Sequence, residues 1–105
     1  MSKISVLDVY NTSTVILLKA LDSGPKTYKQ LERSLPYSSA TITIRLRQLR
    51  ERKFIEKEVR EDNYGHKVEL WKLTDKGKEL LEVLRRAEIL WFGKEVLNPA
   101  TEREK

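Results

Sequence analysis

Residues 38–55 read SSATITIRLRQLRERKFI, and this stretch decides how the rest of the chain is interpreted. It combines a run of β-branched residues near its start with five basic residues and the single acid Glu51. At ~100° per residue, three apolar side chains share one face of a helix: Ile42, Leu46 and Leu49. This spacing predicts a helix over 38–53 that buries the stripe. The opposite face carries small hydroxyl side chains, arginines and an outward Ile44, which solvation alone does not explain.

The composition describes one small domain without cysteine chemistry. At 105 residues the chain suits a single compact domain, and a partner subunit would help its stability. The absence of cysteine excludes disulfides, zinc–thiolate sites and cysteine nucleophiles. No run approaches the ~18 apolar residues of a membrane span, and residues 1–11 lack a signal-peptide pattern. We therefore expect a cytoplasmic protein.

The net charge of +5 is concentrated in the middle third of the chain. Residues 26–60 hold ten basic and four acidic residues, a net charge of +6, whereas residues 1–25 balance at 0 and residues 61–105 sum to −1. A localised basic face is typical of a protein that binds a polyanion. A solvated charged surface is the alternative explanation.

Hydrophobic periodicity and turn residues predict a mainly α fold with a small β-hairpin, of the α+β class. The expected elements, in chain order, are helices over 12–25, 27–36 and 38–53, a hairpin over 55–73 and a long helix over 74–97. Thr27 is a good N-cap with Gln30 three residues on, and Asp62-Asn63-Tyr64-Gly65 has the composition of a turn. We expect a single domain over 1–97 and a polar tail over 98–105. Residues 1–10 could form a helix, a strand or an arm.

Three stretches of this sequence resemble the winged helix-turn-helix regulators of the MarR, PadR and HxlR kind. They are TYKQLERSLPYSSATITIRLRQLRERKFIEK, the hairpin around DNYG, and LTDKGKELL. Together they cover residues 12 to about 92. One departure is Lys53, where these regulators usually have glycine after the recognition helix. The resemblance implies a helix-turn-helix at about 27–54, a wing at about 55–73 and a C-terminal helix that joins two copies.

The resemblance also implies binding to double-stranded DNA, with candidate contacts in three regions. On the recognition helix they are Ser39, Thr41, Thr43, Ile44, Arg45, Arg47 and Gln48. At the start of the preceding helix they are Thr27, Tyr28 and Lys29, and on the wing Arg60, Asn63, Tyr64, His66 and Lys67. Arg47 could recognise guanine, Gln48 adenine, and Ile44 a thymine methyl group. Arg45, Arg50 and Arg52 are expected to touch phosphates or to pair with acids.

The last helix has an apolar arc wider than one small domain needs. One seam of this helix is expected to form the dimer interface: Leu80, Leu84, Ala87 and Trp91. Trp71, Trp91 and Phe92 could instead line an effector pocket, although core or dimer packing is the preferred interpretation. The sequence leaves the existence of an effector open.

We therefore predict a homodimeric, nucleoid-associated transcriptional regulator that places helix 38–53 in the major groove and its wing on the adjacent backbone or minor groove. The alternative is a winged-helix module that binds protein. An enzyme is not expected, because the sequence holds no cysteine and no phosphate-binding glycine-rich loop. Its single histidine is His66. No cofactor or metal is predicted.

Overall fold

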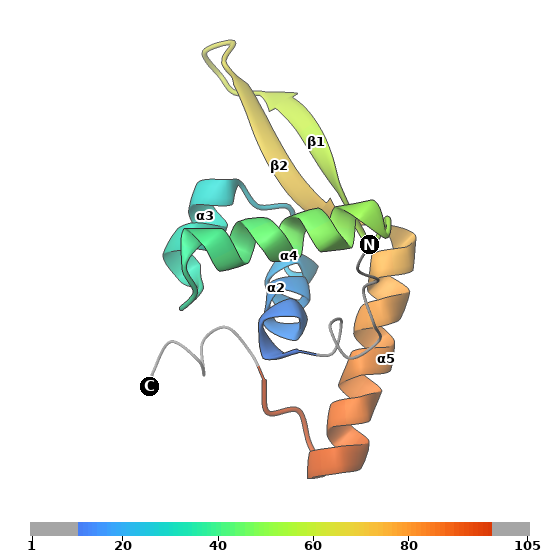
Figure 1. The fold of residues 1–105 in the computed structure, drawn as a ribbon. Helices are drawn as coiled ribbons and strands as arrows, with labels where there is room; N and C mark the ends of the chain where they lie inside the picture. The colour runs from blue at the N-terminus through green and yellow to red at the C-terminus, as the bar shows by residue number, and fades with distance from the viewer. Residues whose placement is uncertain (1–10, 98–105) are drawn as a thin grey trace, which may run out of the picture.

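The computed structural model describes residues 11–97. The elements are α2 (Thr12–Asp22), α3 (Tyr28–Ser34), α4 (Ser39–Glu51), β1 (Ile55–Glu61), β2 (Lys67–Leu73) and α5 (Asp75–Phe92). Figure 1 shows α4 lying across the molecule, the hairpin rising from one end of it and α5 running down one side. The α+β class and the order of helices and hairpin agree with the sequence-based prediction. The expectations for residues 1–10 and 98–105 fall outside the described residues.

Each helix begins at a residue whose side chain accepts a hydrogen bond from the first turn. Asn11, Thr27, Ser38 and Thr74 cap α2, α3, α4 and α5 in this way. At Thr27 the expected capping box with Gln30 is complete, because each residue's side chain bonds the other's backbone N–H. Such caps contribute ~1 kcal/mol each. The short loops between the helices are therefore defined by local chemistry.

The last helix ends earlier than the sequence predicts, at Phe92 instead of about 97. Gly93 takes the left-handed conformation, with φ of 84°, and its N–H bonds the carbonyl of Ile89 at 2.8 Å. This is a common way for a helix to terminate. The chain then folds back, so that Leu97 packs against the core.

Helix α2 forms the centre of the core. Its residues 14–21 are all buried, as expected of a helix surrounded by other elements. The apolar stripe of α4 is buried as predicted, and the structure shows that α4 packs against α2. The remaining core residues come from α3 and its C-cap Leu35, the base of the hairpin and α5. Among residues 11–97, none of the helices is both long and apolar enough to span a membrane.

The hairpin is anchored at its base and extends away from the body (Figure 1). Strands β1 and β2 pair antiparallel from Ile55↔Leu73 to Glu61↔Lys67. Lys26, between α2 and α3, adds a bridge to Trp71 through two backbone hydrogen bonds of 3.0 and 2.7 Å. At the base of the hairpin, β2 is thus paired with β1 and also with Lys26.

The N-cap of α5 bonds to the turn that follows α4. The N–H of Thr74 donates to the carbonyl of Phe54 at 3.0 Å, and its hydroxyl donates to the carbonyl of Lys53 at 2.6 Å. A Cβ atom at Gly77 would collide with the carbonyl oxygen of Phe54. The glycine of the LTDKG motif is therefore required for this close approach of α5 to the turn after α4.

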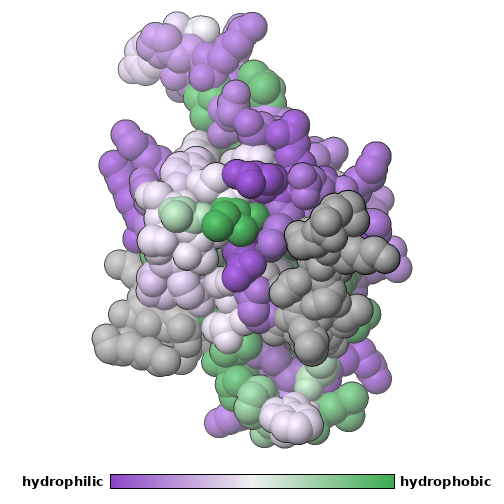
Figure 2. All heavy atoms as spheres, viewed as in Figure 1, coloured by the Kyte–Doolittle hydropathy of each residue, from purple (hydrophilic) through white to green (hydrophobic). Residues whose placement is uncertain are grey.

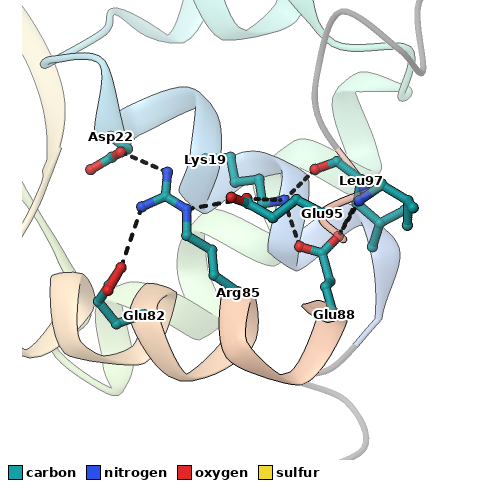
Figure 3. A network of polar contacts seen from close by, with 8 residues as sticks. Lys19, Asp22, Glu82, Arg85, Glu88, Glu95 and Leu97 are labelled. Atoms are coloured by element: carbon teal, nitrogen blue, oxygen red, sulfur yellow. Dashed lines mark hydrogen bonds and ion pairs between the residues drawn. The ribbon is translucent and has the colours of Figure 1, made fainter. Parts of the chain in front are cut away.

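A polar network ties α2 to α5 and to the segment that follows α5 (Figure 3). Its centre is the buried pair Lys19–Glu88, with 2.6 Å between Nζ and Oε2. Arg85 extends the network to Asp22 at 2.9 Å and to Glu95 at 3.3 Å. Hydrogen bonding to Asp22 is the largest cause of the raised pKa of Arg85. This network fixes α5 against the central helix.

Candidate nucleic-acid interface

The outward face of α4 is the candidate reading surface. Ile42, Leu46 and Leu49 are buried, so the opposite side faces away from the core. Residues on that side are exposed, among them Ala40, Thr43, Ile44, Arg47 and Arg50. The side chain of Ile44 is 44% exposed, in agreement with its predicted outward position. The face combines small, apolar and cationic groups on a helix whose other side is fixed in the core.

Tyr28 links α3 to one flank of this face. Its hydroxyl donates to the carbonyl of Ser39 at 3.2 Å and lies 3.3 Å from the hydroxyl of Thr43. The hydroxyl of Ser39 donates in turn to the carboxylate of Glu32 on α3. The structure thus brings together three predicted site residues, but they are partly occupied in holding α3 against α4.

Arg45 lies on the other flank and is half-buried. Its Nε donates to the hydroxyl of Ser13 at 2.9 Å, and one of its terminal nitrogens donates to Oε1 of Gln48 at 3.0 Å. The expected acidic partners of Arg45 are not the ones it contacts. Ser13 was not among the predicted site residues, and only the fold brings it beside α4.

At the start of α3, one predicted contact residue is engaged within the protein and another is exposed. Both the backbone N–H and the hydroxyl of Thr27 are engaged in the capping box with Gln30. The N–H and hydroxyl of Thr27 are therefore already engaged within the protein, and its contact with DNA stays a prediction. Lys29 is exposed on the first turn, where its charge can reach an anion.

The wing carries more acidic residues than expected for a surface that binds only phosphates. Residues 55–73 hold four basic and five acidic residues. Arg60, a predicted contact, forms an ion pair with Glu58, which also pairs with Lys72 at 3.1 Å. Hydrogen bonds first from Arg60 and then from Lys72 lower the pKa of Glu58 to about 2. The cations of this surface are thus largely neutralised by their own neighbours.

The tip of the wing is a turn organised by Asp62. Its Oδ1 accepts the N–H of Tyr64 at 2.8 Å and of His66 at 2.9 Å. Both bonds hold the pKa of Asp62 below its usual value, and the bond from His66 has the larger effect. Tyr64 is 84% exposed, and its ring centroid lies 6.3 Å from that of His66. Asn63 and Lys67 are exposed beside them.

Trp71 connects the wing to α4. Two cations lie over its ring, with Lys57 Nζ at 5.1 Å and Arg50 Cζ at 5.9 Å from the centroid. Contacts of this kind stabilise by ~0.5–1 kcal/mol where the cation is exposed. Trp71 therefore links the hairpin to α4 and packs against the core, in agreement with the preferred packing interpretation.

The predicted dimer seam on α5 divides into buried and exposed residues. Leu84 is only 1% exposed because it packs in the core of its own chain, so its assignment to a dimer interface is wrong. Leu80 and Ala87 are half-buried, whereas Trp91 is 82% exposed. Val83 and Leu90 are exposed near Trp91. In Figure 2 apolar surface gathers at the lower end of the molecule, where α5 ends.

A cavity of about 390 Å³ lies between α2 and α5. Its apolar lining comes from Val15 on α2 and from Ala87, Trp91 and Phe92 on α5. Glu88 also lines it, but its carboxylate is occupied by Lys19 and by backbone N–H groups. Within residues 11–97 we find no group of acids or histidines arranged to hold a metal ion.

Comparisons with known proteins agree with this geometry. The model of the HxlR-like helix-turn-helix family matches residues 10–100. A PadR-like transcriptional regulator from Bacillus cereus superposes with a TM-score of 0.68 at 19% identity, covering 81% of this chain and 88% of that one. Diamide-treated YodB from B. subtilis has a TM-score of 0.67 at 21% identity, covering 88% and 96%.

The reduced form of the transcriptional regulator YodB gives a TM-score of 0.60 at 25% identity, with coverage of 77% and 78%. A comparison with curated protein sequences finds no match. The solved structures are those of regulators and not of enzymes, and they share the winged helix-turn-helix described above. Because the family model spans most of its length, the chain belongs to the HxlR-like helix-turn-helix family.

Proposed function

We propose that this protein is a transcriptional regulator that binds a specific double-stranded DNA sequence as a homodimer. The observation that carries the proposal is the outward face of α4, where Ile44 and Arg47 are exposed on a helix anchored by its opposite side. A major groove ~12 Å wide admits one helix. Small residues at the start of α4, such as Ala40, allow the helix to approach the base edges closely.

Within this proposal the side chains on α4 have different roles. Arg47 is the candidate for a bidentate contact with guanine, and Ile44 for an apolar contact with a thymine methyl group. Lys29 on α3 and Arg50 at the far end of α4 flank them and would neutralise phosphates. These cations account for part of the excess charge of residues 26–60.

The wing would contribute less affinity than the helix. Arg60 is paired with Glu58, so wing contacts would come from the exposed tip residues Asn63, Tyr64, His66 and Lys67. Their size and position suit the adjacent backbone or minor groove. The acidity of the strands would keep the rest of the hairpin away from phosphates.

A second copy of this chain is the proposed partner of the exposed apolar surface on α5. Val83, Leu90 and Trp91 offer a large apolar surface, which single soluble domains rarely leave uncovered. A dimer joined there would present two α4 helices to a site with two-fold symmetry. Trp91 remains in the proposed interface, with Leu80 and Ala87 at its edge, and Leu84 is removed from it.

The proposal is tested by fluorescence anisotropy with a random duplex of about 30 bp, long enough for two half-sites. Affinity should fall linearly on a log–log plot as salt rises, because phosphates are neutralised on binding. Arg47→Glu should abolish binding, whereas Lys78→Glu, an equal charge change at an exposed position on another face of α5, should reduce it only slightly. Failure of the wild-type protein to bind at low salt would refute the proposal and favour a protein partner at Ile44.

A further inference from the structure

A chain of hydrogen bonds runs from the start of α2 to the recognition helix. Asn11 Oδ1, which caps α2 by accepting the N–H of Thr14, also accepts the hydroxyl of Ser13 at 2.7 Å. Ser13 Oγ accepts Nε–H of Arg45, and Arg45 donates to Oε1 of Gln48 at 3.0 Å. Ser13 on α2 therefore holds the guanidinium of Arg45 at Nε, and a terminal nitrogen of the same guanidinium holds Gln48.

The chemistry of this contact determines which way the Gln48 amide is turned. A guanidinium has hydrogen-bond donors and no acceptor. The amide atom of Gln48 that faces Arg45 must therefore be the oxygen. The –NH₂ group in that place would set its own N–H donors against those of the guanidinium. With Oε1 held in this way, Nε2 and its two hydrogens are the part of the amide left for another partner.

We propose that Arg45 is a positioning residue that turns the amide of Gln48 so that it reads the major groove chiefly as a donor, through Nε2. The inference rests on the proposed DNA binding and specifies one contact within it. A free glutamine recognises adenine with both amide atoms, accepting from N6 and donating to N7. The bond from Arg45 uses one of the two lone pairs of Oε1 and turns this oxygen towards the guanidinium, so the bidentate arrangement with adenine is disfavoured. Guanine, whose N7 and O6 are both acceptors, becomes the preferred base.

This assignment changes the expected role of two residues. The sequence predicts that Gln48 reads adenine and that Arg45 touches phosphate or an acid. In the structure Arg45 is half-buried and contacts Ser13 and Gln48, so its influence on DNA passes through Gln48. The effect of removing Arg45 should therefore be a change in base preference and not only a loss of affinity.

The test begins with selection of high-affinity sites from a random duplex library by the wild-type protein. The position read by Gln48 is the one whose preference disappears with Gln48→Ala. All four bases are then compared at that position by anisotropy. The wild type should prefer guanine to adenine by about tenfold, within the range of one good side-chain contact. Arg45→Met should bring the two bases within about twofold, because the amide is then free to rotate.

Two further variants separate positioning from simple charge or stability effects. Arg45→Lys retains a donor beside Gln48 and should restore part of the preference for guanine. Arg33→Met removes an equal charge from an exposed site on α3 and should weaken all four duplexes equally. Circular dichroism of each variant checks that the fold is retained, and Ser13→Ala, which leaves Arg45 in place, gives a second perturbation if Arg45→Met unfolds.

Several results would overturn the inference while leaving DNA binding intact. They are a wild-type preference for adenine at the Gln48 position, no position that depends on Gln48, or an unchanged preference in Arg45→Met. In contrast, absence of salt-dependent binding to any duplex would refute the proposed function itself. The two failures are therefore distinguishable in the same set of measurements.

Discussion

Lys19 and Glu88 form a salt bridge of 2.6 Å between α2 and α5, and each side chain is only 6% exposed. The second carboxylate oxygen of Glu88 accepts the N–H of Leu97 at 2.8 Å and of Val96 at 3.3 Å. Lys19 also donates to the carbonyl of Leu97 (Figure 3). The pair therefore closes the loop of chain that returns from the end of α5 to the core.

Removal of one partner from this pair should be strongly destabilising. Glu88→Ala leaves Lys19 buried with only the half-exposed Glu95 as a counter-charge, and we expect a loss of about 3–5 kcal/mol in the free energy of unfolding. Urea denaturation measures it. Glu82→Ala, on an exposed part of α5, should change the stability by less than about 0.5 kcal/mol. Equal losses in both variants would contradict the structural role of Glu88.

Replacement of Lys53 by glycine should stabilise the protein. Lys53 follows α4 with φ of 66°, a left-handed conformation that a residue with a Cβ adopts at a cost of roughly 1–2 kcal/mol. Glycine avoids that cost but is more flexible when unfolded, so we expect a net gain of about 0.5–1 kcal/mol for Lys53→Gly. Lys53→Ala is the matched control, and an equal gain there would show that the lysine charge matters instead.

Arg47→Ala should reduce binding to the selected DNA site by about 1–3 kcal/mol and relax the preference at one base pair. Arg47 is exposed on the reading face of α4, near the outward Ile44. Anisotropy against the four single-base variants of the site gives the answer. A uniform loss across all sequences would mean that Arg47 touches a phosphate.

Trp91→Glu should convert the protein into a monomer. A charge at this 82% exposed position would be buried against a second copy in the proposed dimer. Sedimentation velocity measures the change. Tyr64→Glu introduces the same charge at an equally exposed aromatic residue of the wing tip and should leave the dimer unchanged. A Trp91→Glu protein that still sediments as a dimer would exclude this part of α5 from the interface.

The wing should keep its ion pairs to unusually low pH. The pKa of Glu58 is lowered from 4.5 to about 2 by Arg60 and Lys72. Because the folded-state pKa is depressed, the stabilising contribution of Glu58 is present above pH 4.5 and is lost as the pH falls towards 2. A carboxyl NMR titration should locate the midpoint, and Arg60→Gln should raise it. A midpoint near 4.5 in the wild type would show that the ion pairs do not persist in solution.

The sequence predicts the elements of this fold better than it predicts their partners. Ser38, Thr27 and the stripe Ile42–Leu46–Leu49 act locally, so spacing alone identifies α4 and the turn before it. Leu84 was misassigned because an apolar helix face does not reveal whether its own core or a second chain covers it. The early end at Gly93 was missed because Val96 and Leu97 continue the apolar pattern, although they are held by Glu88.

The candidate site shows the same limit. The outward position of Ile44 follows from helical periodicity, and the exposure of Arg47 follows with it. The contact of Arg45 with Ser13 could not be foreseen, because the two residues lie 32 positions apart in the chain and meet only after α2 and α4 pack. The pairing of Glu58 on β1 with Lys72 on β2 likewise depends on strand register.

The attachment of the start of α5 to the turn after α4 gives the molecule a mechanical property. Thr74 and Gly77 fix the start of α5 to the turn after α4, and Glu88 fixes α5 to α2, so α5 and α4 would move together as one rigid body. Its 18 residues span ~27 Å, at ~1.5 Å per residue. In a dimer hinged at Trp91, a tilt of ~10° would therefore move each α4 by roughly 5 Å, more than the ~3.4 Å between stacked bases. A small change in the angle between the two copies would therefore be enough to move the two α4 helices into, or out of, register with successive major grooves.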